Sequence, residues 1–176
     1  MEWSFLLAIL TKLGFSSIWV SWIRICIFTP FSILLHGSPF GLISPGRGLR
    51  QGDPLSPFLF ILGLEVFSRL MFKEERNGSL RGLQIVRNCT AIHHLLFADD
   101  LLIFGKAIVI VTATIKACLD KYYRWLGQLV NAAKSSIRFS RNSNPSRTAR
   151  ISTIIPYSTN PSTFLSLGLP NFVREF

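Results

Sequence analysis

The stretch Leu95-Leu96-Phe97-Ala98-Asp99-Asp100-Leu101-Leu102-Ile103-Phe104 decides the fold, because it places two adjacent carboxylates between two short apolar runs. Each run has about the length of a buried strand. Consecutive side chains of a strand point to opposite faces, so both aspartates can serve one site only if the chain turns there. The stretch therefore predicts an antiparallel hairpin with acid at its tip.

The two carboxylates at this tip allow two interpretations. Removing an unpaired carboxylate from water is costly or forces it to take up a proton, so Asp99 and Asp100 between apolar strands indicate nearby cations. Hard divalent ions with oxygen ligands are the natural candidates. The alternative is a solvated turn, since Asp is common in turns. The pair alone does not decide between them.

Length and charge limit the possible classes of protein. The chain has 176 residues, which is enough for one domain with its own core. Its 19 Lys and Arg against 9 Asp and Glu give a net charge of +10, which favours an anionic partner such as nucleic acid or an acidic membrane surface. A solvated basic tail is the alternative, because much of the excess lies late, at Lys134, Arg138, Arg141, Arg147 and Arg150.

The composition is also strongly apolar, at 49% hydrophobic residues with a mean hydropathy of +0.39. The two most apolar windows, 5–28 and 101–119, contain Lys12, Arg24, Lys106 and Lys116. A central Lys or Arg costs about 2.5–3.5 kcal/mol on insertion scales, so we expect buried elements and no membrane association. The first residues lack the basic region of a signal peptide. The three cysteines match no zinc or disulfide pattern, and we expect them to be buried in a protein of a reducing compartment.

Apolar periodicity and turn residues predict alternating helices and strands. Helices are expected over 2–13, 17–28, 57–76 and 107–126, and strands over 31–35, 40–43, 82–86, 92–97, 101–104 and 136–140. The helix 57–76 is apolar on nearly every face, which is typical of a core helix, and Trp19 and Trp22 are also expected in the core. Residues 141–163 predict a mobile, basic segment.

A second motif, Arg47-Gly48-Leu49-Arg50-Gln51-Gly52-Asp53-Pro54-Leu55-Ser56-Pro57, precedes the acidic stretch. In this order, the two motifs resemble the reverse transcriptase of non-LTR retrotransposons, the long interspersed element type abundant in plant genomes. The first motif resembles the template- and nucleotide-contacting loop of the family, and the second its metal-binding hairpin. Looser likenesses extend the resemblance nearly from end to end, at 15–28, 34–40, 130–135 and 167–170.

The resemblance implies a magnesium-dependent nucleotidyltransferase that performs RNA-directed DNA synthesis, with an RNA template, a DNA primer and deoxynucleoside triphosphates. Asp99 and Asp100 would be the catalytic and metal-binding residues for two Mg²⁺ ions. Template or nucleotide contacts would come from Arg47, Gly48, Arg50, Gln51, Gly52 and Lys134. Either arginine can meet a phosphate, and the glycines let backbone approach a nucleotide. For Asp53 we prefer a helix cap to a metal role. An intracellular, nuclear location is also implied.

The resemblance also departs from the family at one point. The family shares its metals with an upstream aspartate for which no residue here has a matching context, so we expect a fragment that is inactive alone. The predicted fold is α+β: a partial polymerase palm at 1–140, a small antiparallel sheet with helices on one face, with incomplete fingers and thumb, and a basic, loosely ordered segment at 141–176. A non-catalytic nucleic-acid-binding relic is the alternative, and a membrane-associated protein a more distant one.

Overall fold

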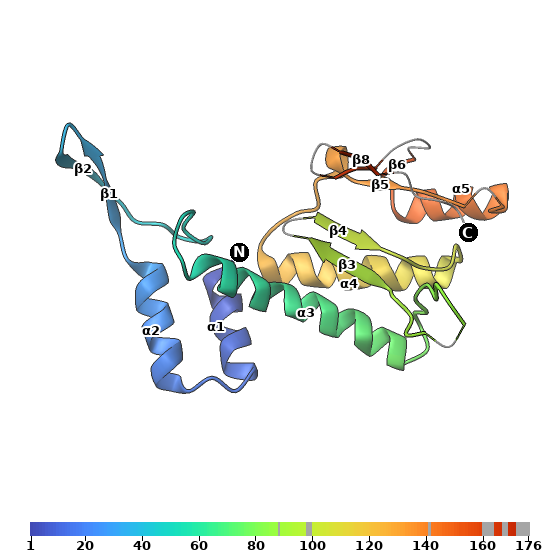
Figure 1. The fold of residues 1–176 in the computed structure, drawn as a ribbon, viewed down its shortest axis with the longest axis horizontal. Helices are drawn as coiled ribbons and strands as arrows, with labels where there is room; N and C mark the ends of the chain where they lie inside the picture. The colour runs from blue at the N-terminus through green and yellow to red at the C-terminus, as the bar shows by residue number, and fades with distance from the viewer. Residues whose placement is uncertain (88, 98–99, 141, 160–163, 167–168, 172–176) are drawn as a thin grey trace. The chain divides into compact units, whose positions relative to one another are not determined.

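The computed structural model describes residues 1–87, 89–97, 100–140, 142–159, 164–166 and 169–171 (Figure 1). Its helices and two-stranded β pairs confirm the predicted α+β class. The chain divides into two compact units. Unit 1 holds residues 1–69 and 121–128, and unit 2 holds residues 70–120 and 129–176. Among the described residues, none of the helices combines the length and apolarity that a bilayer span requires.

Unit 1 begins with two helices that lie side by side, α1 (Trp3–Lys12) and α2 (Ser17–Phe28) (Figure 1). Gly14 follows α1 with a φ of +91°, a conformation that favours glycine. The Ser16 hydroxyl accepts a hydrogen bond from the Trp19 backbone N–H at 3.2 Å, which caps α2. Both helices confirm the predicted ranges to within one residue at each end.

A two-stranded hairpin follows, β1 (Phe31–Leu35) and β2 (Ser38–Ile43), paired antiparallel with Ile33 opposite Phe40. Its turn is His36 and Gly37, with φ values of +49° and +80°. Two such residues form a turn whose twist matches the flanking strands. Every residue of both strands is exposed, and Figure 1 shows the hairpin extending beyond the end of α2.

The core of unit 1 forms where α1 meets the first part of α3 (Ser56–Arg76) and the last turns of α4 (Val109–Leu126). Phe67 is fully buried, with its ring centroid 5.4 Å from that of Tyr122. Phe5 also meets Tyr122, edge to face at 6.3 Å. Burial, with a smaller contribution from the neighbouring Tyr123, raises the pKa of Tyr122 to about 12, so its phenol stays neutral.

The observed exposure of several residues contradicts the predictions. An apolar sequence pattern indicates that a surface tends to be buried, but it does not show that another element packs on it. Phe58 and Ile61 of α3 are 66% and 60% exposed, so the prediction that this helix is buried all round was wrong. Trp22, predicted in the core, is 61% exposed, since α2 buries only its Ile23 face. Cys26 is exposed and Cys89 half-buried, whereas Cys118 is buried as predicted.

Unit 2 contains the hairpin predicted around the acidic stretch, β3 (His94–Phe97) and β4 (Asp100–Ile103), paired antiparallel with Leu95 opposite Leu102. The predicted strand 82–86 was wrong: only a single bridge, Leu83 with Ile92, forms there. The chain turns away directly afterwards, because the Cys89 N–H bonds the Val86 carbonyl and the Gln84 amide bonds the Cys89 carbonyl.

The rest of unit 2 follows α4. A short 3₁₀ helix, η1 (Ala132–Lys134), leads to β5 (Ser136–Ile137), which pairs in parallel with β6 (Ser158–Thr159). Between these strands lies α5 (Pro145–Ile154), a helix that the sequence analysis did not predict; Asn144 caps it by accepting from the Ser146 N–H at 2.9 Å. β7 (Phe164–Ser166) and β8 (Leu169–Asn171) form a last antiparallel pair.

Candidate functional site

The glycine-rich loop before α3 turns at two glycines, Gly48 and Gly52, with φ values of +89° and +83°. Other residues adopt such values only at a cost. The loop is closed onto itself by the Ser56 hydroxyl, which donates to the Arg50 carbonyl at 2.7 Å. The helix α3 begins at Ser56, one residue earlier than predicted. A hydrogen bond between two of its own residues thus closes the loop at the start of α3.

Asp53 uses its carboxylate within the turn that starts α3. Its Oδ1 accepts a hydrogen bond from the Leu55 N–H at 2.8 Å, and its carbonyl accepts from the Ser56 N–H at 3.1 Å. An aspartate carboxylate in a turn commonly accepts a hydrogen bond from the backbone N–H two residues later. This contact favours the capping role over a metal role, as the sequence indicated.

Arg47 and Arg50 were both predicted as possible phosphate ligands, and the structure gives them different contacts. Arg50 donates to the Thr29 carbonyl at 3.0 Å, and its guanidinium lies 5.0 Å from the centroid of the Phe31 ring. It therefore holds the start of β1. The Arg47 side chain is 70% exposed, and its nearest carboxylate oxygen, on Glu2, lies 4.0 Å away. An exposed ion pair at this distance contributes little to stability. The Arg47 guanidinium is therefore less engaged by protein groups than that of Arg50.

A pocket of about 390 Å³ opens beside this loop, entirely within unit 1. Its lining includes the polar residues Arg47, Arg50, Gln51 and Asp53 and the apolar residues Trp3, Phe31 and Leu59. Gly48 and Cys26 also line it. The loop residues were predicted from the sequence. Trp3, Cys26 and Phe31 were not, and they line the pocket from three other elements. No local signal in the sequence marks those three as pocket residues.

The acidic hairpin lies in unit 2. Asp100 begins β4 opposite Phe97 and is exposed, so a carboxylate stands at the end of the hairpin. Asp99 lies outside the described residues. A carboxylate oxygen suits a hard divalent ion, so Asp100 fits as one ligand. Within the described part of the chain, no three His, Cys, Asp or Glu side chains come together as a metal site. Lys134, another predicted nucleotide or template residue, is exposed on η1 in the same unit.

A buried histidine at the base of this hairpin escaped the sequence analysis. His93 is 2% exposed, stacks on His94, and meets the edge of Phe72 at 4.6 Å between ring centroids. Its Nδ1 lies 2.6 Å from the Nδ1 of His94, a distance that requires one ring to donate and the other to accept. Its Nε2 has no hydrogen bond among the described residues, and the Glu75 Oε2 is 3.5 Å away.

Burial of His93 predicts a loss of stability in mild acid. Desolvation lowers the pKa of its imidazole below the ordinary 6.5, although the Glu75 charge opposes this. The unfolded chain therefore binds the proton first as the pH falls, so stability present above about pH 6.5 is lost as the pH falls toward the folded-state pKa. Denaturant midpoints at pH 7.5, 6.5 and 5.5 should decrease in that order. His93→Gln should flatten the decrease; a midpoint that rises toward pH 5.5 would contradict the expectation.

The helices and small antiparallel strand pairs fit the partial polymerase palm predicted from the sequence. A family model described as reverse transcriptase (RNA-dependent DNA polymerase) matches residues 1–169. The chain belongs to the reverse transcriptase family, which confirms the resemblance predicted from the two motifs. Members of this family generally use divalent metal ions, nucleic-acid templates and nucleotide substrates.

Three relatives match parts of the chain. An uncharacterised mitochondrial protein of Arabidopsis thaliana is 54% identical over 67 residues, which are 38% of this chain and 55% of that protein. Two are retrovirus-related Pol polyproteins from the type-1 retrotransposable element R2. The Popillia japonica polyprotein is 35% identical over 99 residues (56% of this chain, 13% of the polyprotein), and that of Nasonia vitripennis is 41% identical over 64 residues (36% and 6%). The chain thus spans about half of the first relative and a small part of the polyproteins.

Proposed function

We propose that this chain supplies the nucleotide pocket and the acidic hairpin of an enzyme that performs RNA-directed DNA synthesis. The observation that carries the proposal is the pocket of about 390 Å³ that Arg47, Arg50 and Gln51 line together with apolar residues. Its volume lies within the range of about 300–1,000 Å³ that small-molecule sites occupy. The family membership of residues 1–169 supports the same assignment.

The chemistry of the pocket suits a deoxynucleoside triphosphate. A triphosphate is strongly anionic, and guanidinium groups bind phosphate oxygens through charge-assisted hydrogen bonds. Arg47 is the proposed phosphate ligand, because Arg50 already bonds the Thr29 carbonyl. Gln51 offers both a donor and an acceptor to a base or sugar. The net charge of +10 favours approach of an anionic template as well.

The hairpin is the proposed metal site, with Asp99 and Asp100 as ligands of Mg²⁺. When bound, such ions would supply stabilisation of the negative charge that develops at the phosphates during in-line displacement. Lys134 and the basic residues after it are proposed to contact the template backbone, where each cation makes binding salt-dependent. Residues 1–140 would form the palm part and 141–176 a basic extension that contains α5.

The proposal predicts that Arg47→Ala weakens triphosphate binding about tenfold. A hydrogen bond to a charged group contributes about 1.5–3 kcal/mol, and 1.4 kcal/mol corresponds to a factor of about ten. Arg69→Ala is the matched control, since Arg69 is also exposed in unit 1 but pairs with Glu65 at 2.8 Å on α3. The affinity of both variants would be measured by calorimetric titration with dGTP.

Cys26 gives an independent readout, because it is exposed and lines the pocket. Bound dGTP should slow its alkylation by iodoacetamide in the parent chain and less so in Arg47→Ala. Primer extension on an RNA template with Mg²⁺, by the chain and by a version extended with its upstream codons, tests synthesis itself. Equal dGTP affinity in both arginine variants would contradict the pocket assignment, and RNA binding without synthesis in either chain would favour a non-catalytic binder.

A further inference from the structure

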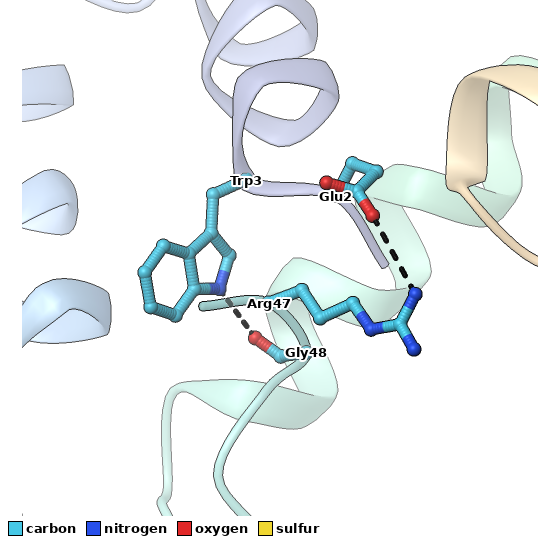
Figure 2. Close-up of polar contacts among 4 residues, drawn as sticks. All are labelled: Glu2, Trp3, Arg47 and Gly48. Atoms are coloured by element: carbon cyan, nitrogen blue, oxygen red, sulfur yellow. Dashed lines mark hydrogen bonds and ion pairs between the residues drawn. The ribbon is translucent and has the colours of Figure 1, made fainter. Parts of the chain in front are cut away.

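Met1 and Trp3 hold the glycine-rich loop through both polar groups of the Gly48 backbone. The Trp3 indole N–H donates to the Gly48 carbonyl at 2.6 Å (Figure 2). The Gly48 N–H donates to the Met1 carbonyl at 2.8 Å. Glu2 lies 4.0 Å from the Arg47 guanidinium, on the neighbouring residue of the loop. We call Met1, Glu2 and Trp3 the amino-terminal clamp. The clamp contacts the loop at Arg47 and Gly48, which both line the pocket.

The clamp is itself firmly seated in unit 1. Met1 is 8% and Trp3 6% exposed, and the Trp3 ring packs on Phe28 with 4.3 Å between centroids. The Glu2 N–H donates to the Leu126 carbonyl at 3.0 Å, which ties the clamp to the end of α4. The terminal methyl of Met1 fills the space above Gly63, where a β-carbon would lie 2.5 Å from it. Such contacts fix the clamp on the helices, and the clamp in turn holds the loop at Gly48.

Gly48 has a φ of +89°, and glycine can adopt many other backbone conformations at little cost. External contacts are therefore needed to keep it in this one. Ordering one residue of backbone costs about 1–2 kcal/mol. If the clamp were absent, a ligand would have to order the loop when it binds, and its affinity would be reduced accordingly. Trp3 lines the same pocket, so one side chain supplies both a wall and the hydrogen bond that sets the loop.

We propose that Trp3 is a positioning residue, whose indole N–H holds Gly48 and thereby keeps Arg47 and Arg50 in place around the pocket. The inference rests on the proposed function for the identity of the ligand, but the ordering of the loop can be tested without a ligand. Trp3→Phe is the informative variant, because it keeps an aromatic ring against Phe28 and removes the donor. Trp22→Phe is the matched control, since Trp22 is exposed on α2.

Tryptic cleavage of the full chain reads the order of the loop directly, because trypsin cuts after Arg47 and Arg50. A net hydrogen bond contributes about 1 kcal/mol, a factor of about five. We therefore expect Trp3→Phe to speed cleavage after Arg47 about fivefold, with no change at Lys121 and Arg124 in α4 and none anywhere in Trp22→Phe. A rate after Arg47 equal to that of the parent chain would overturn the inference.

If Trp3→Phe unfolds and trypsin cuts every site faster, a second measurement still tests the role of the clamp. In the unaltered chain, the Gly48 amide should exchange with solvent more slowly than the Gly46 amide, because it is bonded to the Met1 carbonyl; equal rates overturn the clamp. Titration with dGTP separates the two proposals. If the unaltered chain fails to bind, the proposed function fails and the cleavage result stands; if it binds, Trp3→Phe should raise the Kd about fivefold at an unchanged saturating signal.

Discussion

Phe67→Ala is expected to lower the free energy of unfolding of unit 1 by about 3–5 kcal/mol, the usual cost of truncating a fully buried aromatic residue. Phe67 has no exposed surface and packs on Tyr122, which in turn meets Phe5 of α1. Its loss leaves a cavity where α1, α3 and α4 converge. Since domains are stable by only about 5–15 kcal/mol, such a loss removes much of what keeps the pocket assembled.

Intrinsic fluorescence makes this measurement specific to unit 1. All four tryptophans, Trp3, Trp19, Trp22 and Trp125, lie within its residues. Urea titration followed by tryptophan emission should therefore shift strongly to lower urea in Phe67→Ala. Phe58→Ala is the control on the same helix; its side chain is 66% exposed, and surface substitutions usually change stability by less than about 0.5 kcal/mol. Similar shifts in the two variants would contradict the burial of Phe67.

The elements that the sequence predicted well are those specified by neighbouring residues. Ser16 and Gly14 set the ends of α2 and α1. The β1–β2 hairpin was also predicted, but it turns at His36 and Gly37, so β2 begins at Ser38 and not at residue 40. The apolar run before the two aspartates pairs with the run after them, which gives β3 and β4. In each case the deciding contact spans only a few residues, so residue type and spacing suffice.

The contacts that the sequence could not predict join distant segments. Trp3 and Gly48 are separated by 45 residues, and nothing near either of them indicates the bond between them. The contact of His93 with Glu75 and the parallel pairing of β5 with β6 likewise depend on how the chain folds back. The same limit explains why Arg47 and Arg50 were indistinguishable as phosphate ligands: only the position of Thr29 and Phe31 beside Arg50 separates their roles.

Gly82 shows how such a distant contact constrains a residue that the sequence presents as unremarkable. A β-carbon on Gly82 would lie 2.7 Å from the carbonyl carbon and oxygen of Ile92 and 2.9 Å from the His93 nitrogen. These are backbone atoms, so they cannot rotate away as a side chain would. The next residue, Leu83, exchanges two hydrogen bonds with Ile92, at 2.7 and 2.9 Å. Gly82→Ala should break this bridge, which leads directly into His93 and β3.

We expect Gly82→Ala to destabilise this part of unit 2 by about 3 kcal/mol, the upper range for overpacking. Hydrogen exchange of peptides from 83–97, read by mass spectrometry, should then rise by about two orders of magnitude. Gly46→Ala is the control: no atom lies within 4 Å of its β-carbon, so it should be neutral or stabilise by up to about 1 kcal/mol. If residues 83–97 of Gly82→Ala exchange as slowly as those of the parent chain, Gly82 does not approach Ile92 closely. In that case the Leu83–Ile92 bridge does not support the hairpin that carries Asp100.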